Sequence, residues 1–201
     1  MNEPPEVESF GPVGEVVAAS TTEYLTQCRA LYGAPPLGTL VKSEGHDAIY
    51  GIVGEVATQS IDPGRRPMAM GRHDETSEAV YKRNPQLTRL LATEFRSVVV
   101  GYRANGTLHR YLAPLPPKIH SSVFQCDLDE AIEFSGSLDF VPLLLAAPFG
   151  SQDDIISSFL RAASTAHPDP ERFLVEAGRD LANLLGGQFQ RLNGILTRLT
   201  S

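Results

Sequence analysis

The chain of 201 residues is long enough to bury a sizeable core, and its content of 42% hydrophobic and 20% charged residues is typical of a globular rather than a disordered protein. The net charge of -7 disfavours general nucleic-acid binding, which requires cations that neutralise phosphates. The longest apolar run, residues 141–147, is far shorter than the roughly 18 residues that span a bilayer, and the acidic N-terminus does not resemble a signal peptide. We therefore expect a cytoplasmic protein without membrane insertion.

The chain begins with signals for short strands. Residues 1–11 are expected to form a flexible tail. The β-branched and apolar stretch 13–20 predicts a first strand, and the alternation in 21–31, with Tyr24 and Cys28 on one face, predicts a second.

The next segment predicts two more strands. Residues 39–58 contain two strand-like runs around a turn at Gly45. Gly51 and Gly54 interrupt the second run, where glycine is typical of a bulge or a sharp bend. Such bends allow a small sheet to close into a barrel.

A polar insertion follows these strands. Residues 60–76 predict a loop long enough to be functional or mobile, and 76–83 and 84–93 predict two short helices. Asn84 suits the N-cap of the second helix, and Pro85 suits its first helical position.

A hairpin is predicted next, from 93–103 and 107–112. Asn105 and Gly106 favour a type I′ turn, because both central residues of that turn need a positive φ. A short strand is predicted at 121–125.

The C-terminal part changes to helical periodicity. Residues 127–134 predict a short helix, 138–148 form an apolar segment, and a helical stripe starts after Ser151. Asp169 and Pro170 mark the start of a further helix. Its apolar stripe continues to the end of the chain through Leu181, Leu185, Phe189, Leu192, Leu196 and Leu199. The pattern leaves two alternatives open, packing on the barrel or a helical interface with another subunit.

These elements together predict an α+β fold, namely a small antiparallel β-barrel with inserted short helices and a C-terminal helical tail. The predicted organisation is a tail at 1–11, a barrel domain at 12–148 and a helical segment at 149–201. The barrel domain contains the insertion at about 60–93.

The charge is unevenly distributed. Residues 65–110 contain nine Lys or Arg and four Asp or Glu, a net charge of +5, so the rest of the chain carries -12. This asymmetry is either an ordinary solvated surface or a basic face for an acidic partner, a second subunit or a phosphate backbone. The candidate residues for such a face are Arg65, Arg66, Arg72, Lys82 and Arg83.

The sequence lacks the common motifs of nucleotide, metal and hydrolase sites. No glycine is followed by lysine, so there is no phosphate-binding P-loop, and the glycine-rich dinucleotide motif, the paired-histidine zinc motif and the nucleophile-elbow motif are also missing. Cys28 and Cys126 have no metal-type spacing and suit small buried positions. We predict no catalytic residues, no metal and no cofactor.

Two clusters around histidines leave a chemical alternative open. His46 lies beside Asp47, and His73 precedes Asp74 and Glu75. Such clusters can bind a metal or act as acid and base, but a turn and the start of a helix also explain them.

Two stretches resemble a known family. Residues 13–56, "VGEVVAASTTEYLTQCRALYGAPPLGTLVKSEGHDAIYGIVGEV", resemble the opening of HerA-type DNA translocases. Residues 98–124, "VVVGYRANGTLHRYLAPLPPKIHSSVF", resemble a later segment of the same barrel. This module is the HAS barrel, which HerA shares with ATP synthase subunits, and the resemblance covers about 13–147. The P-loop ATPase core that would follow in the family is not found here, so no catalytic residue is carried over.

Three hypotheses follow. The first is a non-catalytic, HAS-like barrel for protein interaction or assembly, acting as a homo-oligomer or beside a larger ATPase-type or other complex. The second is a nucleic-acid accessory protein that uses the 65–110 segment. The third is a small enzyme or metal protein centred on His73, Asp74 and Glu75.

Overall fold

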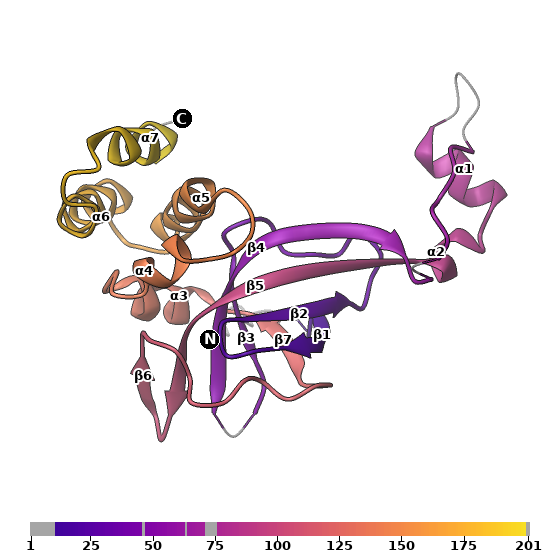
Figure 1. Cartoon of the computed structure of the whole chain (residues 1–201), viewed down its shortest axis with the longest axis horizontal. Coiled ribbons are helices and arrows are strands. Elements are labelled where there is room, and N and C mark those ends of the chain that lie inside the picture. The colour runs from indigo at the N-terminus through magenta and orange to yellow at the C-terminus, as the bar shows by residue number, and fades with distance from the viewer. Residues whose placement is uncertain (1–10, 46, 63, 71–75, 200–201) are drawn as a thin grey trace, which may run out of the picture.

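The computed structural model describes residues 11–45, 47–62, 64–70 and 76–199, and within them the chain folds into a closed barrel beside a group of helices (Figure 1). The strands run in the order β2-β1-β7-β3-β4-β5, and β2 also pairs with β5, which closes six antiparallel strands into a barrel. A further strand, β6, pairs with β5 outside the closed ring. The strands are β1 Gly14–Ala19, β2 Glu23–Cys28, β3 Leu40–Ser43, β4 Ala48–Ser60, β5 Leu91–Ala104, β6 Thr107–His109 and β7 Ser122–Gln125.

The predicted α+β fold with a small antiparallel barrel is confirmed. Two short helices are inserted between β4 and β5, and the remaining helices follow the barrel strands. The helices in the described residues are α1 Ser77–Arg83, α2 Leu87–Leu90, α3 Leu128–Ser135, α4 Val141–Leu145, α5 Gln152–Ser164, α6 Pro170–Leu184 and α7 Phe189–Leu199.

The glycine and turn predictions are also confirmed. The register between β4 and β5 shifts at Gly51 and again around Gly54, as expected for bulges that curve the barrel wall. A Cβ on Gly51 would lie 2.7 Å from the Tyr24 hydroxyl, so this bend brings the backbone close to a buried ring. Asn105 and Gly106 have φ values of 51° and 81°, as a type I′ hairpin turn requires.

Both ends of the second inserted helix, predicted over 84–93, were predicted wrongly, because residues 91–93 belong to β5. The helix α2 begins at Leu87 with Gln86 at its N-cap, not at Pro85. Asn84 instead ends α1, and its side-chain amide donates to the carbonyl of Val80. Its capping ability is therefore used at the end of the preceding helix.

The barrel wall separates two hydrophobic cores. Successive side chains of β5 point to opposite faces, so Val99 lies inside the barrel while Val98 and Val100 lie in the outer core. The inner core contains Val16, Tyr24, Cys28, Val41, Ile49, Val53, Phe95, Val99, Ala113 and Val123.

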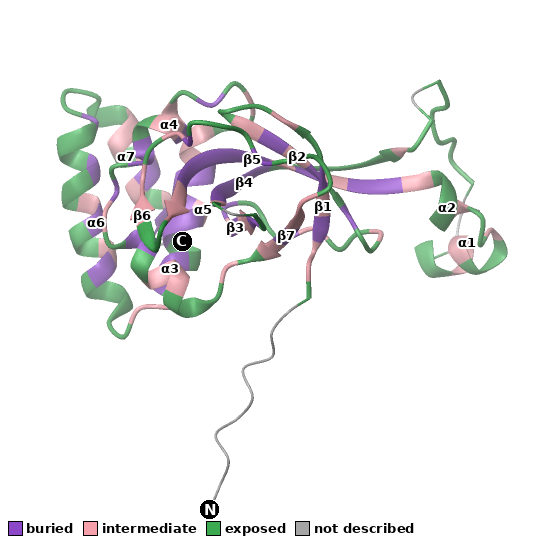
Figure 2. Cartoon of the chain, turned by 90° about the horizontal axis from the view of Figure 1, so that it is seen from below, coloured by how far each residue is buried: buried purple, intermediate pink, exposed green. Residues whose placement is uncertain are grey.

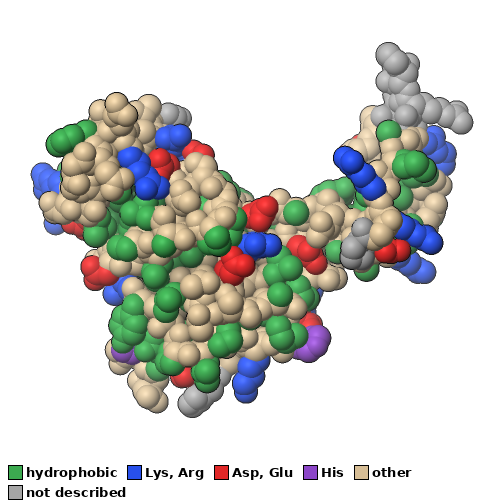
Figure 3. All heavy atoms as spheres, in the orientation of Figure 1, with side chains coloured by type: hydrophobic (Ala, Val, Ile, Leu, Met, Phe, Trp, Pro, Cys, Tyr) green, Lys and Arg blue, Asp and Glu red, His purple; other side chains and the backbone are tan. Residues whose placement is uncertain are grey.

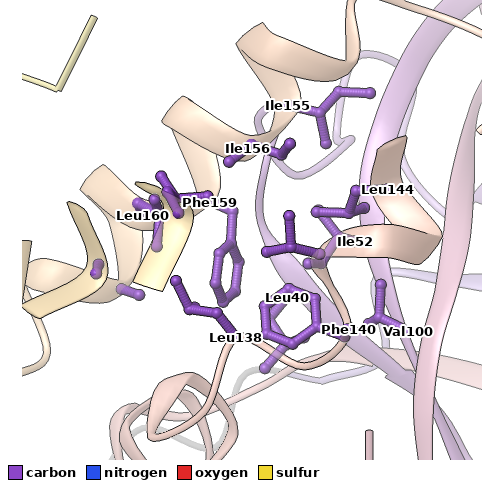
Figure 4. Close-up of a cluster of buried hydrophobic side chains, with 14 of the residues drawn as sticks. Leu40, Ile52, Val100, Leu138, Phe140, Leu144, Ile155, Ile156, Phe159 and Leu160 are labelled. Carbon is purple, nitrogen blue, oxygen red and sulfur yellow. The ribbon is translucent and has the colours of Figure 1, made fainter. Parts of the chain in front are cut away.

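The outer core lies between the barrel wall and the helices. Side chains of α5 point toward β3, β4 and β5, with residues of α4 and of the segment before it packed between them (Figure 4). The labelled members are Leu40, Ile52, Val100, Leu138, Phe140, Leu144, Ile155, Ile156, Phe159 and Leu160. The helices α6 and α7 join the same cluster through α5, so a single core connects the C-terminal helices to the barrel.

A long arm extends from the opposite side of the barrel (Figures 1 and 2). The strands β4 and β5 pair from Ala48 with Arg103 to Ser60 with Leu91, whereas β3 covers β4 only as far as Ile52 and β2 covers β5 only from Glu94. We call the described residues of 55–93 the arm, and those of 61–90 its tip.

Candidate functional site

The arm tip packs little against the rest of the described chain. Neither α1 nor α2 contains a buried residue, and both are largely exposed in Figure 2. Other apolar side chains of the arm are exposed as well: Met68 is 85% exposed and Ile61 is 56% exposed. Val56, Met70 and Leu90 complete this set.

The two tip helices are too short to be stable alone. They contain seven and four residues, whereas isolated helices shorter than about 12 residues are marginal in water. Helices in proteins gain most of their stability from packing an apolar face. The apolar residues of these two helices are at most half-buried, so the described chain provides little of that packing.

A tyrosine contact connects the tip to the barrel. The rings of Tyr32 and Tyr81 meet edge to face with centroids 6.2 Å apart, and their hydroxyls are hydrogen-bonded. Tyr32 follows β2 and has a φ of 63°. Its backbone N–H donates to the Thr93 hydroxyl at 2.8 Å, and that hydroxyl also bonds to Thr58 on the facing strand.

Lys and Arg side chains gather on this tip (Figure 3). Arg65, Arg66, Lys82 and Arg83 are all exposed there, whereas Arg72 lies outside the described residues. Arg65 lies 3.4 Å from Asp62, and Arg83 donates to the carbonyl of Met70. Arg66, Lys82 and Arg89 have no ion pair within the described part of the chain.

The cations on β5 and the residues after it do not join this cluster. Arg96 lies near Glu23 and Glu55, and Arg103 lies 2.5 Å from Glu133. Arg110 donates to backbone carbonyls at the end of α3. The basic residues of 65–110 therefore fall into two groups. Those of the tip include cations without an ion pair in the described residues, whereas Arg96, Arg103 and Arg110 are bonded to carboxylates or backbone carbonyls of the body.

The C-terminal stripe packs mainly within the chain. Leu181, Leu185 and Leu199 are buried in the outer core, and Leu192 and Leu196 pack against it. These five leucines are therefore not an exposed interface in this structure, because α5 already covers them. Phe189, at the start of α7, is 74% exposed.

One serine and one histidine meet in an arrangement that the sequence did not indicate. The Ser135 hydroxyl lies 2.8 Å from Nε2 of His167 and donates to the carbonyl of Ala131 at 2.7 Å. With its proton used there, the serine oxygen accepts from the imidazole. His167 stacks on Phe173, and partial burial lowers the pKa of His167 despite the nearby Glu176. The pair links α3 to the start of α6.

An ion-pair network joins α3 to the barrel. Lys42 on β3 lies 2.6 Å from Glu130, which also accepts from the Tyr50 hydroxyl at 3.3 Å. Arg103 donates to that hydroxyl at 3.2 Å and pairs with Glu133. Burial alone would lower the pKa of Lys42, but the hydrogen bond and charge of Glu130 outweigh it, so the pKa is raised. Lys42 and Arg103 are therefore each paired with a carboxylate of α3.

Both cysteines are free thiols. Cys28 is buried, and burial together with Glu94 raises its pKa to about 11. Burial and the neighbouring Glu130 also raise the pKa of Cys126. Both are therefore protonated near neutral pH, consistent with the expected packing role.

The predicted histidine clusters fall largely outside the described residues. His46, His73, Asp74 and Glu75 are not among them, and Asp47 is exposed. In the described ranges, no group of three or more His, Cys, Asp or Glu residues is arranged to hold a metal ion. None of the described helices is long and apolar enough to cross a membrane.

No protein-family model matches the chain, and no curated protein matches it at a significant level.

Sequence reasoning missed the arm and its tyrosine contact. The basic residues were predicted to lie on an insertion between two strands. In the structure this insertion lies at the end of a long ribbon formed by β4 and β5. The length of the strands that precede and follow the insertion was a signal, since apolar and β-branched residues continue past Gly54 toward Thr58. The pairing of Tyr32 with Tyr81 had no local signal.

Proposed function

We propose that this protein is a non-catalytic barrel module of the HAS type that assembles with other protein through its projecting arm. The resemblance of residues 13–56 and 98–124 to HerA-type barrels supports the module, and the closed barrel is compatible with it. The tip is the surface that contacts the partner.

One observation carries this proposal: the two tip helices bury no residue within the described chain. Exposed apolar side chains next to unpaired cations favour a protein interface, because a partner can cover the former and neutralise the latter. The polar clusters of the body favour a structural role, since Lys42 with Glu130 and Ser135 with His167 are bonded to each other.

A tip-less variant tests the proposal. Ser60 and Leu91 are paired residues, so replacing 61–90 by Asn-Gly would close the arm with a two-residue hairpin turn. We expect this variant to keep the barrel and its thermal unfolding transition. Affinity purification from the source cells, followed by reconstitution with the purified components, should give a complex with the full chain and none with the variant.

Two results would count against the proposal. If both chains bind the same proteins and have the same oligomeric state, the tip does not take part in the interaction. A full chain that stays monomeric and binds no protein at cellular concentration would remove the assembly role itself.

A second candidate function rests on the unpaired cations Arg66, Lys82 and Arg89. They could contact a nucleic-acid backbone, although the net charge of -7 opposes this. Changing Arg66, Lys82 and Arg89 to Glu should then weaken DNA or RNA binding and reduce its dependence on salt. An absence of binding at low salt would end this alternative.

A further inference from the structure

A groove runs along α6 at the other end of the molecule. It consists of a cavity of about 320 Å³ near His167 and one of about 210 Å³ near Leu184, which share Leu138 and Asp180. Its apolar lining includes Phe173 and Ala177. We call these two adjoining cavities the α6 groove.

The charge of the α6 groove is negative. Asp139, Asp169 and Asp180 line it, and its one arginine, Arg172, is neutralised by Glu176 at 2.9 Å. Asp169 caps α6, whereas Asp139 and Asp180 have no ion pair within the described residues. The groove therefore combines an apolar lining with unpaired carboxylates.

The arm tip has the complementary properties. It offers exposed apolar side chains, including Met68 and Met70, beside the unpaired cations Lys82 and Arg89. Methionine adapts to irregular apolar surfaces, which suits a shallow groove. Residues 61–90 contain six Lys or Arg and four Asp or Glu. The rest of the chain contains 11 Lys or Arg and 20 Asp or Glu. The tip is thus positive and the body strongly negative.

The placement of the two surfaces prevents contact within one molecule. In Figure 1 the tip lies at one end of the long axis and α6 at the other, with the barrel between them. A tip that meets an α6 groove must therefore belong to another copy. Such a contact joins different surfaces of the two copies and continues from copy to copy.

We infer that the arm tip of one copy binds the α6 groove of a second copy, so that the protein forms head-to-tail rings or filaments. This inference rests on the proposed function and names the partner of the same tip. Two short helices cover less than the roughly 800 Å² per partner of a standard interface, so a single contact is weak. Association therefore depends on concentration and falls as salt screens the charges.

A charge exchange on the full-length protein tests the inference. The first variant carries Lys82→Glu with Arg89→Glu, and the second carries Asp139→Lys with Asp180→Lys. All four positions are exposed, so the fold should be kept, which circular dichroism and thermal unfolding verify. Sedimentation velocity over a series of protein and salt concentrations gives the association of each.

The expected pattern is specific to this contact. Each variant alone carries tip and groove of like charge, so its association should weaken at least tenfold. An equimolar mixture restores opposite charges at every contact, and a chain with all four changes does the same within one sequence. Both should associate again. The control, Arg29→Glu with Lys118→Glu, changes the net charge as much as the first variant at exposed sites elsewhere and should associate as the wild type does.

Several results would overturn the inference. These are a wild type that is monomeric at all concentrations, variants that associate like the wild type, or a mixture that does not recover. If the chain is monomeric but the tip-less variant loses a different protein, docking to a second copy fails and the proposed function stands. Binding of the tip to DNA without self-association would overturn both.

Discussion

Tyr32 and Tyr81 join their hydroxyl groups across the space between the barrel and the arm, with ring centroids 6.2 Å apart. Tyr32 belongs to the turn after β2, and Tyr81 belongs to α1 at the tip. The backbone of Tyr32 is held at the same time by Thr93 on β5. The contact therefore orients the tip relative to the barrel without burying it.

Tyr81→Phe should loosen the tip and leave the body unchanged. An exposed hydrogen bond contributes about 0.5–1.5 kcal/mol, which corresponds to roughly a twofold to tenfold rise in local opening. Trypsin should cut the tip, at sites such as Lys82, faster by that factor, while the midpoint of global unfolding stays constant. Tyr111→Phe removes an exposed hydroxyl at the barrel and is the matched control. Equal cleavage of both variants would contradict the orienting role.

Thr26→Val and Thr93→Val should have opposite effects, although both threonines are buried. The Thr26 hydroxyl has no hydrogen-bond partner within the described structure, so its removal should be neutral or add up to about 1 kcal/mol of stability. The Thr93 hydroxyl accepts from Tyr32, so its removal should cost about 1–3 kcal/mol. Denaturant unfolding measures both. A cost above about 1 kcal/mol for Thr26→Val would indicate a buried water at this hydroxyl.

The pH dependence of stability should report on His167. Its pKa is lowered in the folded protein, mainly by burial, so below the ordinary value of about 6.5 the unfolded chain binds a proton more readily than the folded one. This component of stability is present above pH 6.5 and is lost as the pH falls through the folded pKa. His167→Gln removes it, so the stability advantage of the wild type over the variant should shrink from pH 7 to pH 5. If the difference in stability between the wild type and His167→Gln stays constant or grows from pH 7 to pH 5, His167 does not contribute in this way.

The C-terminal leucines should act on folding and not on association. Leu181 is fully buried, so Leu181→Ala should lower the free energy of unfolding by about 2–5 kcal/mol. Phe189 is exposed, so Phe189→Ala should change it by less than about 0.5 kcal/mol. Denaturant unfolding of the two variants compares them directly. A small effect of Leu181→Ala would mean that the tail does not depend on the outer core.

Local features of the fold were predictable from the sequence because their causes are local. The hairpin turn follows from Asn105 and Gly106, and the curvature of β4 follows from Gly51 and Gly54. The alternation that buries Tyr24 and Cys28 in β2 was also visible, since it depends only on period-two spacing.

Features that join distant segments were not predictable in the same way. The pairing of β2 with β5 closes the barrel, but nothing near Glu23 specifies Val98 as its partner. The apolar stripe that contains Leu181 must pack against another element, but sequence periodicity does not show that this element is α5. The net charge of 65–110 likewise includes Arg103 together with the basic residues of the tip, although Arg103 forms an ion pair with Glu133 in the body.

A photoreactive amino acid at the arm tip would test the docking role most directly. Placed at Met68, which is 85% exposed, it should crosslink to protein in the source cells, and mass spectrometry would identify the crosslinked residues. The same group at Leu115, which is 74% exposed on the barrel, is the matched control. We predict a defined protein adduct from position 68 and none from position 115. No adduct from either position, equal adducts from both, or a nucleic-acid adduct from position 68 would contradict the proposed function.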